Sequence, residues 1–245
     1  MGLVVVILGS GVVAIGLYVF FVEPLWMLPW LERLTPTIVY RVRTEKPLVA
    51  LSFDDGPHPK FTPQVLEILA RHAAKATFFL IGERALCEPE TVLRIRAEGH
   101  EIGNHYFENG PTLGHSDGEF IKKLEATERT LGAAGMLRFF RPPGGVAWPR
   151  QLRLARERGY TCVLGCAYPH DPMRPPVKYI WWLIRKNLAP GTIVILHDGI
   201  RDATRSIAAL PRILEEGRRR GLRFVSIGKL LDEGHAAGED GNPDR

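Results

Sequence analysis

The chain has 245 residues, of which 45% are hydrophobic, and it carries a formal net charge of +5. This length suits one globular domain with an appendage, and the apolar fraction is sufficient for a buried core. The densest basic cluster, Arg218, Arg219 and Arg220, lies at the end of a predicted helix, where cations complement the helix dipole. The other positive charges are spread along the chain, so we expect no nucleic-acid partner.

The first predicted element is an apolar segment near the N-terminus. Residues 3–22 are an uninterrupted run without charge, long enough to cross a bilayer core of roughly 30 Å at about 1.5 Å per residue. Trp26 and Trp30 follow at the place of an interfacial aromatic belt. Because no basic leader precedes the run, the pattern predicts a retained membrane anchor at 1–30 rather than a cleaved signal peptide.

After a predicted linker at 31–46, strand-like and helix-like segments alternate. The predicted strands are 47–54, 75–81, 101–105, 139–141, 161–167, 192–197 and 223–227. Helices are predicted from 62, from 116, and over 148–158, 177–188 and 204–219. This alternation favours one α/β domain at 47–232 with a parallel sheet, either open or closed into a barrel. The polar, glycine-rich residues 233–245 are predicted to form a disordered tail.

The most informative motif ends the strand predicted at 47–54. Residues 52–57 read Ser-Phe-Asp-Asp-Gly-Pro. Neighbouring side chains on a strand point to opposite faces, so Asp54 and Asp55 reach one site only if the chain turns at Gly56 and Pro57. An ordinary Asp-Gly turn with a capping aspartate is the alternative. We interpret the pair as part of a site because further polar motifs follow later strands.

Those motifs occur in a recognisable order: Gly-His-Glu-Ile-Gly-Asn-His at 99–105, Arg-Pro-Pro-Gly-Gly at 141–145, Tyr-Pro-His-Asp-Pro at 168–172 and Ile-Val-Ile-Leu-His-Asp at 193–198. The series resembles the polysaccharide deacetylase family, NodB-like metal-dependent amidohydrolases that remove N-acetyl groups from chitin-type glycans and peptidoglycan. The resemblance covers roughly residues 47–230. With the predicted strands, it implies a distorted (β/α) barrel of about seven parallel strands.

The resemblance also implies the catalytic roles. Asp54 would be the general base and His197 the general acid. Arg141 would fix the base, while Asp171 would orient His197 and raise its pKa. The oxyanion or the substrate would contact two further residues, Gly144 and Leu196. Hydrolysis of an amide needs such a base, an acid and an oxyanion stabiliser.

The implied metal site departs from the family pattern. Asp55 and His105 would bind a divalent metal, with zinc expected first and manganese or cobalt as alternatives. The family motif His-x-x-x-His carries Asn109 at its distal position here. One helical turn would still present residues 105 and 109 together, and an amide oxygen is a weaker, harder ligand than imidazole. His115 and Glu108 are the alternative third ligands.

Two aromatic positions of the family pattern also differ. Gly144 stands after Arg-Pro-Pro, and Pro172 follows Asp171. Gly144 keeps its backbone N–H for the oxyanion but removes a side chain from the wall of the sugar subsite. The sequence therefore indicates the type of reaction more clearly than it indicates the identity of the substrate.

The expected function is a membrane-anchored, metal-dependent deacetylase acting on N-acylated amino sugars of a polysaccharide or glycolipid. A non-catalytic glycan-binding relative and a different C–N or ester hydrolase on the same scaffold are the alternatives. The glycan substrates of the family favour an extracytoplasmic domain. Arg33, Arg41 and Arg43, which follow the apolar run, favour the opposite orientation by the positive-inside rule.

Overall fold

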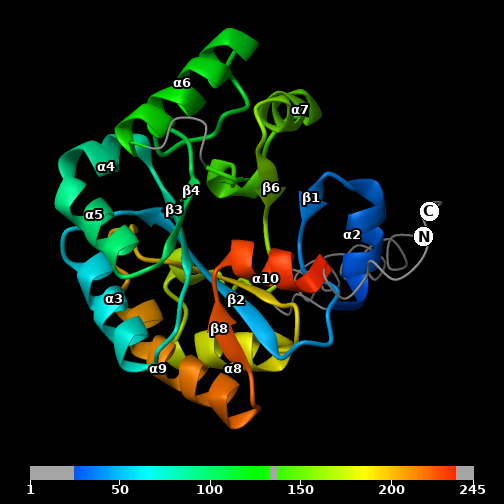
Figure 1. The fold of residues 1–245 in the computed structure, drawn as a ribbon, viewed down its shortest axis with the longest axis vertical. Helices are drawn as coiled ribbons and strands as arrows, with labels where there is room; N and C mark the ends of the chain where they lie inside the picture. Colours follow the sequence, from blue (N-terminus) through cyan, green and yellow to red (C-terminus); the bar gives the residue numbers. More distant parts are fainter. Residues whose placement is uncertain (1–24, 133–136, 236–245) are drawn as a thin grey trace, which may run out of the picture.

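The computed structural model describes residues 25–132 and 137–235. One sheet lies at the centre of the domain and most helices lie around its outside (Figure 1). The strand order is β1-β6-β5-β4-β3-β2-β7, and β8 also pairs with β2. The strands are β1 Ile38–Val39, β2 Leu48–Gly56, β3 Thr77–Leu80, β4 Glu101–Asn104, β5 Phe139–Phe140, β6 Thr161–Val163, β7 Ile193–His197 and β8 Arg223–Val225.

All pairings between these strands are parallel, as the alternation of elements predicted. The seven predicted strands are present, and the short β1 is an addition. Within the described residues, β1 and β7 share no continuous ladder. Isolated bridges join Arg41 to Thr192 and Ala167 to Val194 instead. The sheet is therefore an incomplete barrel.

The helices that follow the strands are only partly those expected. They are α2 Leu28–Leu34, α3 Phe61–Arg71, α4 Gly82–Cys87, α5 Pro89–Ala97, α6 Asp117–Thr130, α7 Pro149–Glu157, α8 Val177–Asn187, α9 Thr204–Arg219 and α10 Ile227–His235. The Ser116 hydroxyl caps α6 by accepting from the Glu119 N–H at 3.3 Å. Pro211 lies inside α9 without ending it. Helices α2, α4, α5 and α10 were not predicted.

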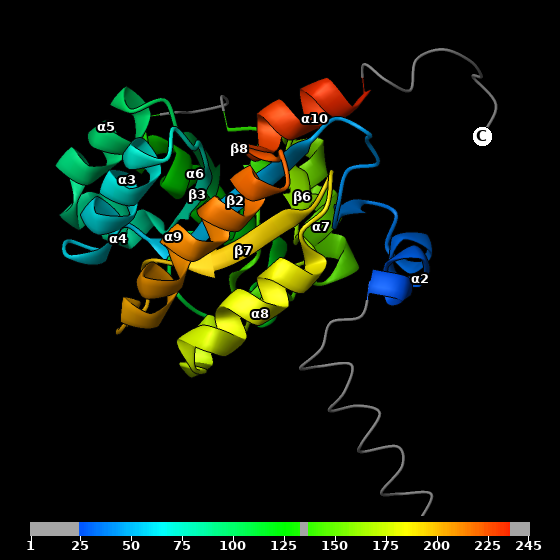
Figure 2. The same ribbon diagram turned by 90° about the horizontal axis from the view of Figure 1, so that it is seen from below.

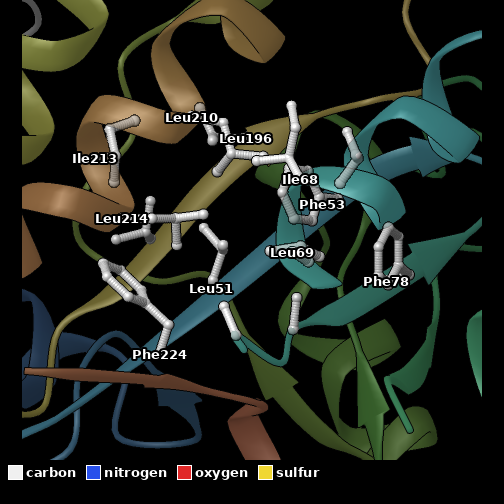
Figure 3. Close-up of a cluster of buried hydrophobic side chains, with 14 of the residues drawn as sticks. Leu51, Phe53, Ile68, Leu69, Phe78, Leu196, Leu210, Ile213, Leu214 and Phe224 are labelled. Carbon is white, nitrogen blue, oxygen red and sulfur yellow. The ribbon is translucent and has the colours of Figure 1, made fainter. Parts of the chain in front are cut away.

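The largest part of the core lies between the sheet and helices α3 and α9. Figure 3 shows Leu51 and Phe53 of β2 packed with Leu69 of α3 and Leu214 of α9. Each fully buried side chain of this kind stabilises the fold by roughly 1.5–3 kcal/mol. Strand β2 is buried along most of its length, so its carboxyl end is a rigid base for a site.

The terminal regions differ from the prediction. The predicted linker contains β1 and the end of α2, and Leu28 packs with Tyr40 and Cys166 in a buried cluster. Burial of these apolar side chains makes the segment part of the domain. Helix α2 lies on the opposite side of the domain from α3, α4 and α5 (Figures 1 and 2). At the other end, α10 continues to His235, so the predicted tail begins inside a helix.

Two predicted segments lie outside the described residues. They are the apolar run at 3–22 and the tail from 236 onward. In the two described ranges, no helix is both long enough and apolar enough to cross a membrane.

Candidate active site

Asp54 and Asp55 lie at the carboxyl end of β2 and line one cavity of about 560 Å³. Asp54 is paired in register with His197 of the neighbouring strand β7. Asp55 has a φ of 66°, in the left-handed region, and this turn brings the second carboxylate into the same cavity. Such a conformation costs on the order of 1 kcal/mol for a residue other than glycine. Arg84 holds it by donating from Nη1 to the carbonyl oxygens of Asp55 and Gly199.

Arg141 fixes the position of Asp54. Its side chain is 3% exposed, and Nη1 donates to Asp54 Oδ1 at 2.5 Å and to Ser52 Oγ at 2.8 Å. Nε donates to the Val163 carbonyl oxygen at 2.8 Å. The guanidinium also lies 4.0 Å from the centroid of the Phe79 ring. Contacts on three sides thus fix the guanidinium of Arg141, and its hydrogen bond fixes the position of the Asp54 carboxylate.

His105 and Asp55 form the pair of residues suited to a metal. His105 Nδ1 lies 2.8 Å from the Arg141 carbonyl oxygen, which only accepts, so Nδ1 carries a hydrogen. Nε2 lies 3.2 Å from Asp55 Oδ1. Burial raises the pKa of Asp55, but the hydrogen bond and charge of His105 outweigh it and lower the pKa to about 2. Two donor atoms each bound at about 2.1 Å to one ion lie roughly 3–3.4 Å apart. The pair fits a divalent ion.

Asn109 lines the same cavity, although not through the predicted helical turn. Residues 105–109 are not helical, because Tyr106 has a φ of 74° and its N–H donates to Asn104 Oδ1 at 2.8 Å. The Asn109 N–H donates to Glu83 Oε1 at 3.4 Å. The described ranges hold no group of three His, Cys, Asp or Glu side chains that could bind a metal. Asn109 adds a side-chain amide to the lining of this cavity.

His115 and Glu108, the alternative third ligands, are engaged elsewhere. His115 Nδ1 lies 2.8 Å from the Tyr106 hydroxyl, and the two rings stack with centroids 5.6 Å apart. Glu108 accepts from Lys123 Nζ at 2.9 Å. Neither His115 nor Glu108 lines the cavity. Their side chains contact Tyr106 and Lys123 instead.

His197 and Asp171 form the second pair at the cavity. His197 Nδ1 lies 2.9 Å from Asp171 Oδ1, and the His197 backbone N–H donates to Oδ2 at 2.8 Å. The Ser206 hydroxyl of α9 donates to the same Oδ2 at 2.6 Å. Burial lowers the pKa of His197, but the charge and hydrogen bond of Asp171 outweigh it, and the carboxylates of Asp54 and Asp55 add to them. The pKa is raised to about 9, so the imidazole of His197 is protonated at neutral pH.

The remaining two predicted residues lie in different surroundings. Gly144 lines the cavity with a φ of 66°, a conformation that favours glycine, and a Cβ there would meet no other atom within 4 Å. Leu196 is buried in the core, as Figure 3 shows, and the cavity is lined by Ile195 instead. Alternate residues of a strand face opposite sides, which explains why His197 and Ile195 share the cavity.

Sequence reasoning missed the residues that support the site. Arg84 and Ser206 contact Asp55 and Asp171, but each is a single polar residue within a helix and belongs to no local motif. Ser52 opens the motif at 52–57, but its hydrogen bond with Arg141 was not predicted. Asp198 is also buried at this edge of the sheet, where it accepts from the Thr62 hydroxyl, and burial raises its pKa to about 7. Its position directly after His197 was the available signal.

Comparison with known proteins shows where the chain belongs. The family model for polysaccharide deacetylase matches residues 41–163. The peptidoglycan-N-acetylglucosamine deacetylase of Bacillus cereus is 37% identical over 212 residues, which cover 83% of this chain and 98% of the relative. The crystal structure of the Bc1960 peptidoglycan N-acetylglucosamine deacetylase is similar with a TM-score of 0.76 at 32% identity, covering 79% of this chain and 92% of that chain.

A second similar structure is that of BA3943 of Bacillus anthracis, a CE4 family pseudoenzyme. Its TM-score is 0.74 at 26% identity, over 83% of this chain and 72% of that chain. The family model matches half of the chain, and a relative above 30% identity spans most of it. The chain belongs to the polysaccharide deacetylase family.

Proposed function

We propose that the protein is a metal-dependent hydrolase that removes N-acetyl groups from the amino sugars of a glycan. One observation carries this proposal: Asp54, Asp55 and His105 line one cavity together with His197. Asp55 is paired with His105, and Asp171 holds the ring of His197 from outside the lining. The similarity to a deacetylase that acts on the N-acetylglucosamine of peptidoglycan supports the substrate class.

We assign the metal to Asp55 and His105, with the amide oxygen of Asn109 as the third protein ligand. A divalent ion held by these residues would lower the pKa of a water molecule and would polarise the amide carbonyl. Zinc suits the imidazole, whereas manganese suits the two oxygen ligands.

The side chains of the cavity would carry out the proton transfers. Asp54, held by Arg141, accepts a proton as water adds to the amide carbonyl carbon. The Gly144 N–H donates to the oxygen that becomes negative. His197 then gives its proton to the nitrogen as the C–N bond breaks, so that acetate and a free amine leave. Asp171 fixes the ring and the tautomer of His197.

The test is direct. The purified full-length protein is incubated with N-acetylglucosamine oligomers and with zinc, cobalt or manganese, and both acetate and free amine are measured. Equal amounts of the two products, abolished by a chelator, are expected. Absence of both products with every metal would contradict the proposed activity.

A second candidate function is glycan binding without catalysis. Asn109 at the third ligand position favours it, as does the similarity to a pseudoenzyme. The buried pairs Asp54–Arg141 and His197–Asp171 oppose it, because buried charges are costly to retain unless they serve a purpose. Oligomer binding without release of acetate would establish this second function.

Replacement of Asn109 by histidine is expected to raise zinc affinity and to increase the preference for zinc over manganese. The substitution exchanges a hard amide oxygen for an imidazole nitrogen. Titration of the metal-free wild type and Asn109→His with each metal measures both quantities. The control is Gln64→His, which changes a surface amide of α3 outside the cavity. Unchanged zinc affinity in Asn109→His would remove Asn109 from the ligand set.

Asp171→Asn is expected to move the alkaline limb of the kcat/KM profile to lower pH. His197, with its pKa raised to about 9, donates a proton below that pH, so activity falls as the pH rises through 9. Without the charge of Asp171, burial lowers this pKa. The control is Asp117→Asn, which changes a half-exposed carboxylate at the start of α6. An alkaline limb at the same pH in Asp171→Asn and the wild type would show that another group is the acid.

We also propose that residues 3–22 anchor the protein in a membrane with the domain on the extracytoplasmic side. The charge-free run and the following tryptophans support the anchor, and a glycan substrate supports the side. The full-length protein is expected in the membrane fraction after a high-salt wash, with the domain accessible to protease only from outside. A processed, soluble form in native extracts would contradict the anchor.

A further inference from the structure

The cavity that holds Asp54 and His197 has an apolar side that the proposed chemistry does not use. This apolar wall is made of six side chains: Leu25, Met27, Leu28, Leu31, Leu164 and Ile195. Four of them come from residues 25–31, before the part of the chain that the family model matches. An amino-sugar polymer presents hydroxyl and amide groups and has little hydrocarbon to place against such a wall.

The wall is a fixed part of the domain. Leu28 packs with Tyr40 and Cys166, and Leu25 and Leu164 lie against the same cluster. The end of α2 is held by Thr35, whose hydroxyl lies 2.7 Å from the Leu31 carbonyl oxygen and 2.9 Å from the Tyr40 hydroxyl. The side chains that face the cavity are therefore held in place before any ligand binds.

The same segment also exposes large apolar side chains to the surroundings. Trp26 is 64% exposed, Trp30 63% and Leu34 77%. Tryptophan is enriched where protein meets the polar part of a bilayer, and clustered exposed apolar residues mark interaction surfaces. The charge-free run at 3–22 ends three residues before Leu25. Four residues of the apolar wall thus lie close in sequence to the part of the chain best suited to a membrane, with Glu23 and Pro24 between them.

We propose that the apolar wall binds the hydrocarbon chain of an amphiphilic glycoside, in which a lipid aglycone carries the N-acetylated amino sugar. This inference rests on the proposed deacetylase function and narrows its substrate class. We assign the hydrocarbon to the aglycone because the wall residues 25–31 belong to the same segment as the exposed Trp26 and Trp30. If these tryptophans lie at a bilayer surface, the part of the lipid chain that extends beyond the wall stays in the apolar bilayer. Gly144 and Pro172 line the same cavity, and a Cβ on Gly144 would meet no other atom within 4 Å, which leaves room for the sugar there.

The experiment compares methyl and octyl glycosides of the same N-acetylglucosamine oligomer. The full-length protein, in phosphatidylcholine vesicles, is expected to deacetylate the octyl glycoside with a kcat/KM at least about tenfold higher. Burial of one methylene group strengthens binding about fourfold, so two methylenes of the octyl chain buried against the wall are enough to give this ratio.

Leu31→Glu is expected to lower the octyl-to-methyl ratio about tenfold by placing a charge in the wall. Leu93→Glu changes an exposed leucine of α5 outside the cavity and is expected to keep the wild-type ratio. The octyl glycoside partitions into the vesicles to the same extent in the assays of the wild type, Leu31→Glu and Leu93→Glu. A difference in the octyl-to-methyl ratio of kcat/KM between these proteins therefore reports on the wall. If circular dichroism shows that Leu31→Glu is unfolded, Met27→Glu replaces it.

Two outcomes would overturn the inference while leaving the deacetylase function intact. One is an equal octyl-to-methyl ratio in the wild type and the wall variant. The other is a Leu31-dependent preference for N-octanoyl over N-acetyl oligomers without any effect of the octyl aglycone, which would assign the wall to the acyl group.

If none of the oligomers is deacetylated, the proposed function fails, and calorimetry decides on the wall by itself. Tenfold tighter binding of the octyl glycoside, lost in Leu31→Glu and kept in Leu93→Glu, would support the inference. Equal binding of both glycosides to the wild type would overturn it.

Discussion

Asp54→Asn is expected to lower kcat by roughly 10²- to 10⁴-fold while the bound metal is retained. Asp54 Oδ1 accepts from Arg141 at 2.5 Å, whereas Asp55 faces His105 at 3.2 Å, so the two adjacent carboxylates have different partners. An amide at position 54 still accepts the hydrogen bond from Arg141 but cannot take a proton from water. Turnover of an N-acetylglucosamine oligomer and elemental analysis of the dialysed protein measure the two effects separately.

Asp55→Asn is the matched variant, because it makes the same change one residue away. It is expected to lose most of the metal, and its activity is expected to fall for that reason. If both variants lose the metal to the same extent, or if Asp54→Asn keeps its activity, the proposed division of roles between the two carboxylates is wrong.

Arg141→Met is expected to reduce the free energy of unfolding by about 3–5 kcal/mol, because it leaves the Asp54 carboxylate without its partner in a buried place. The side chains of Arg141 and Asp54 are only 3% and 6% exposed, so water replaces little of the lost interaction. Denaturant unfolding of the full-length protein, followed by circular dichroism, measures the change.

Two further variants test whether the loss of stability in Arg141→Met comes from the unpaired buried charge of Asp54. Asp54→Asn in the Arg141→Met background removes the uncompensated charge and is expected to restore part of the lost stability. Arg138→Met removes a surface pair with Asp232, in which both side chains are more than half exposed, and is expected to cost less than about 1 kcal/mol. A similar loss in Arg138→Met and Arg141→Met would contradict the buried-pair argument.

The sequence contained enough to predict the strands and the main groups of the site. Asp54 and His197 each end an apolar run, and His105 ends the strand predicted at 101–105. These three residues could therefore be placed at strand ends, and the carboxyl ends of parallel strands meet at one edge. The prediction of a helical turn at 105–109 was wrong because the left-handed backbone of Tyr106 redirects the chain. That conformation is unusual for tyrosine, and a pattern of residue types does not reveal it.

The supporting residues were beyond sequence reasoning for a different reason. Ser206 is 35 residues from Asp171, and Arg84 is 29 residues from Asp55. Such contacts depend on how α9 and α4 pack against the sheet, and no local pattern encodes that packing. The short α4 and α5 were missed in the same way, because neither has a capping motif or a long apolar period.

The place of residues 25–39 within the domain has a practical consequence. Strand β1 pairs with β6 through Ile38 and Val39, so a shortened protein that begins after β1 would expose the edge of β6. Unpaired strand edges are templates for aggregation. Such a truncation, convenient for removing the hydrophobic run, would also open one flank of the catalytic cavity to solvent. Failure of that shortened protein to act on a lipid-linked sugar would therefore say nothing about the intact enzyme.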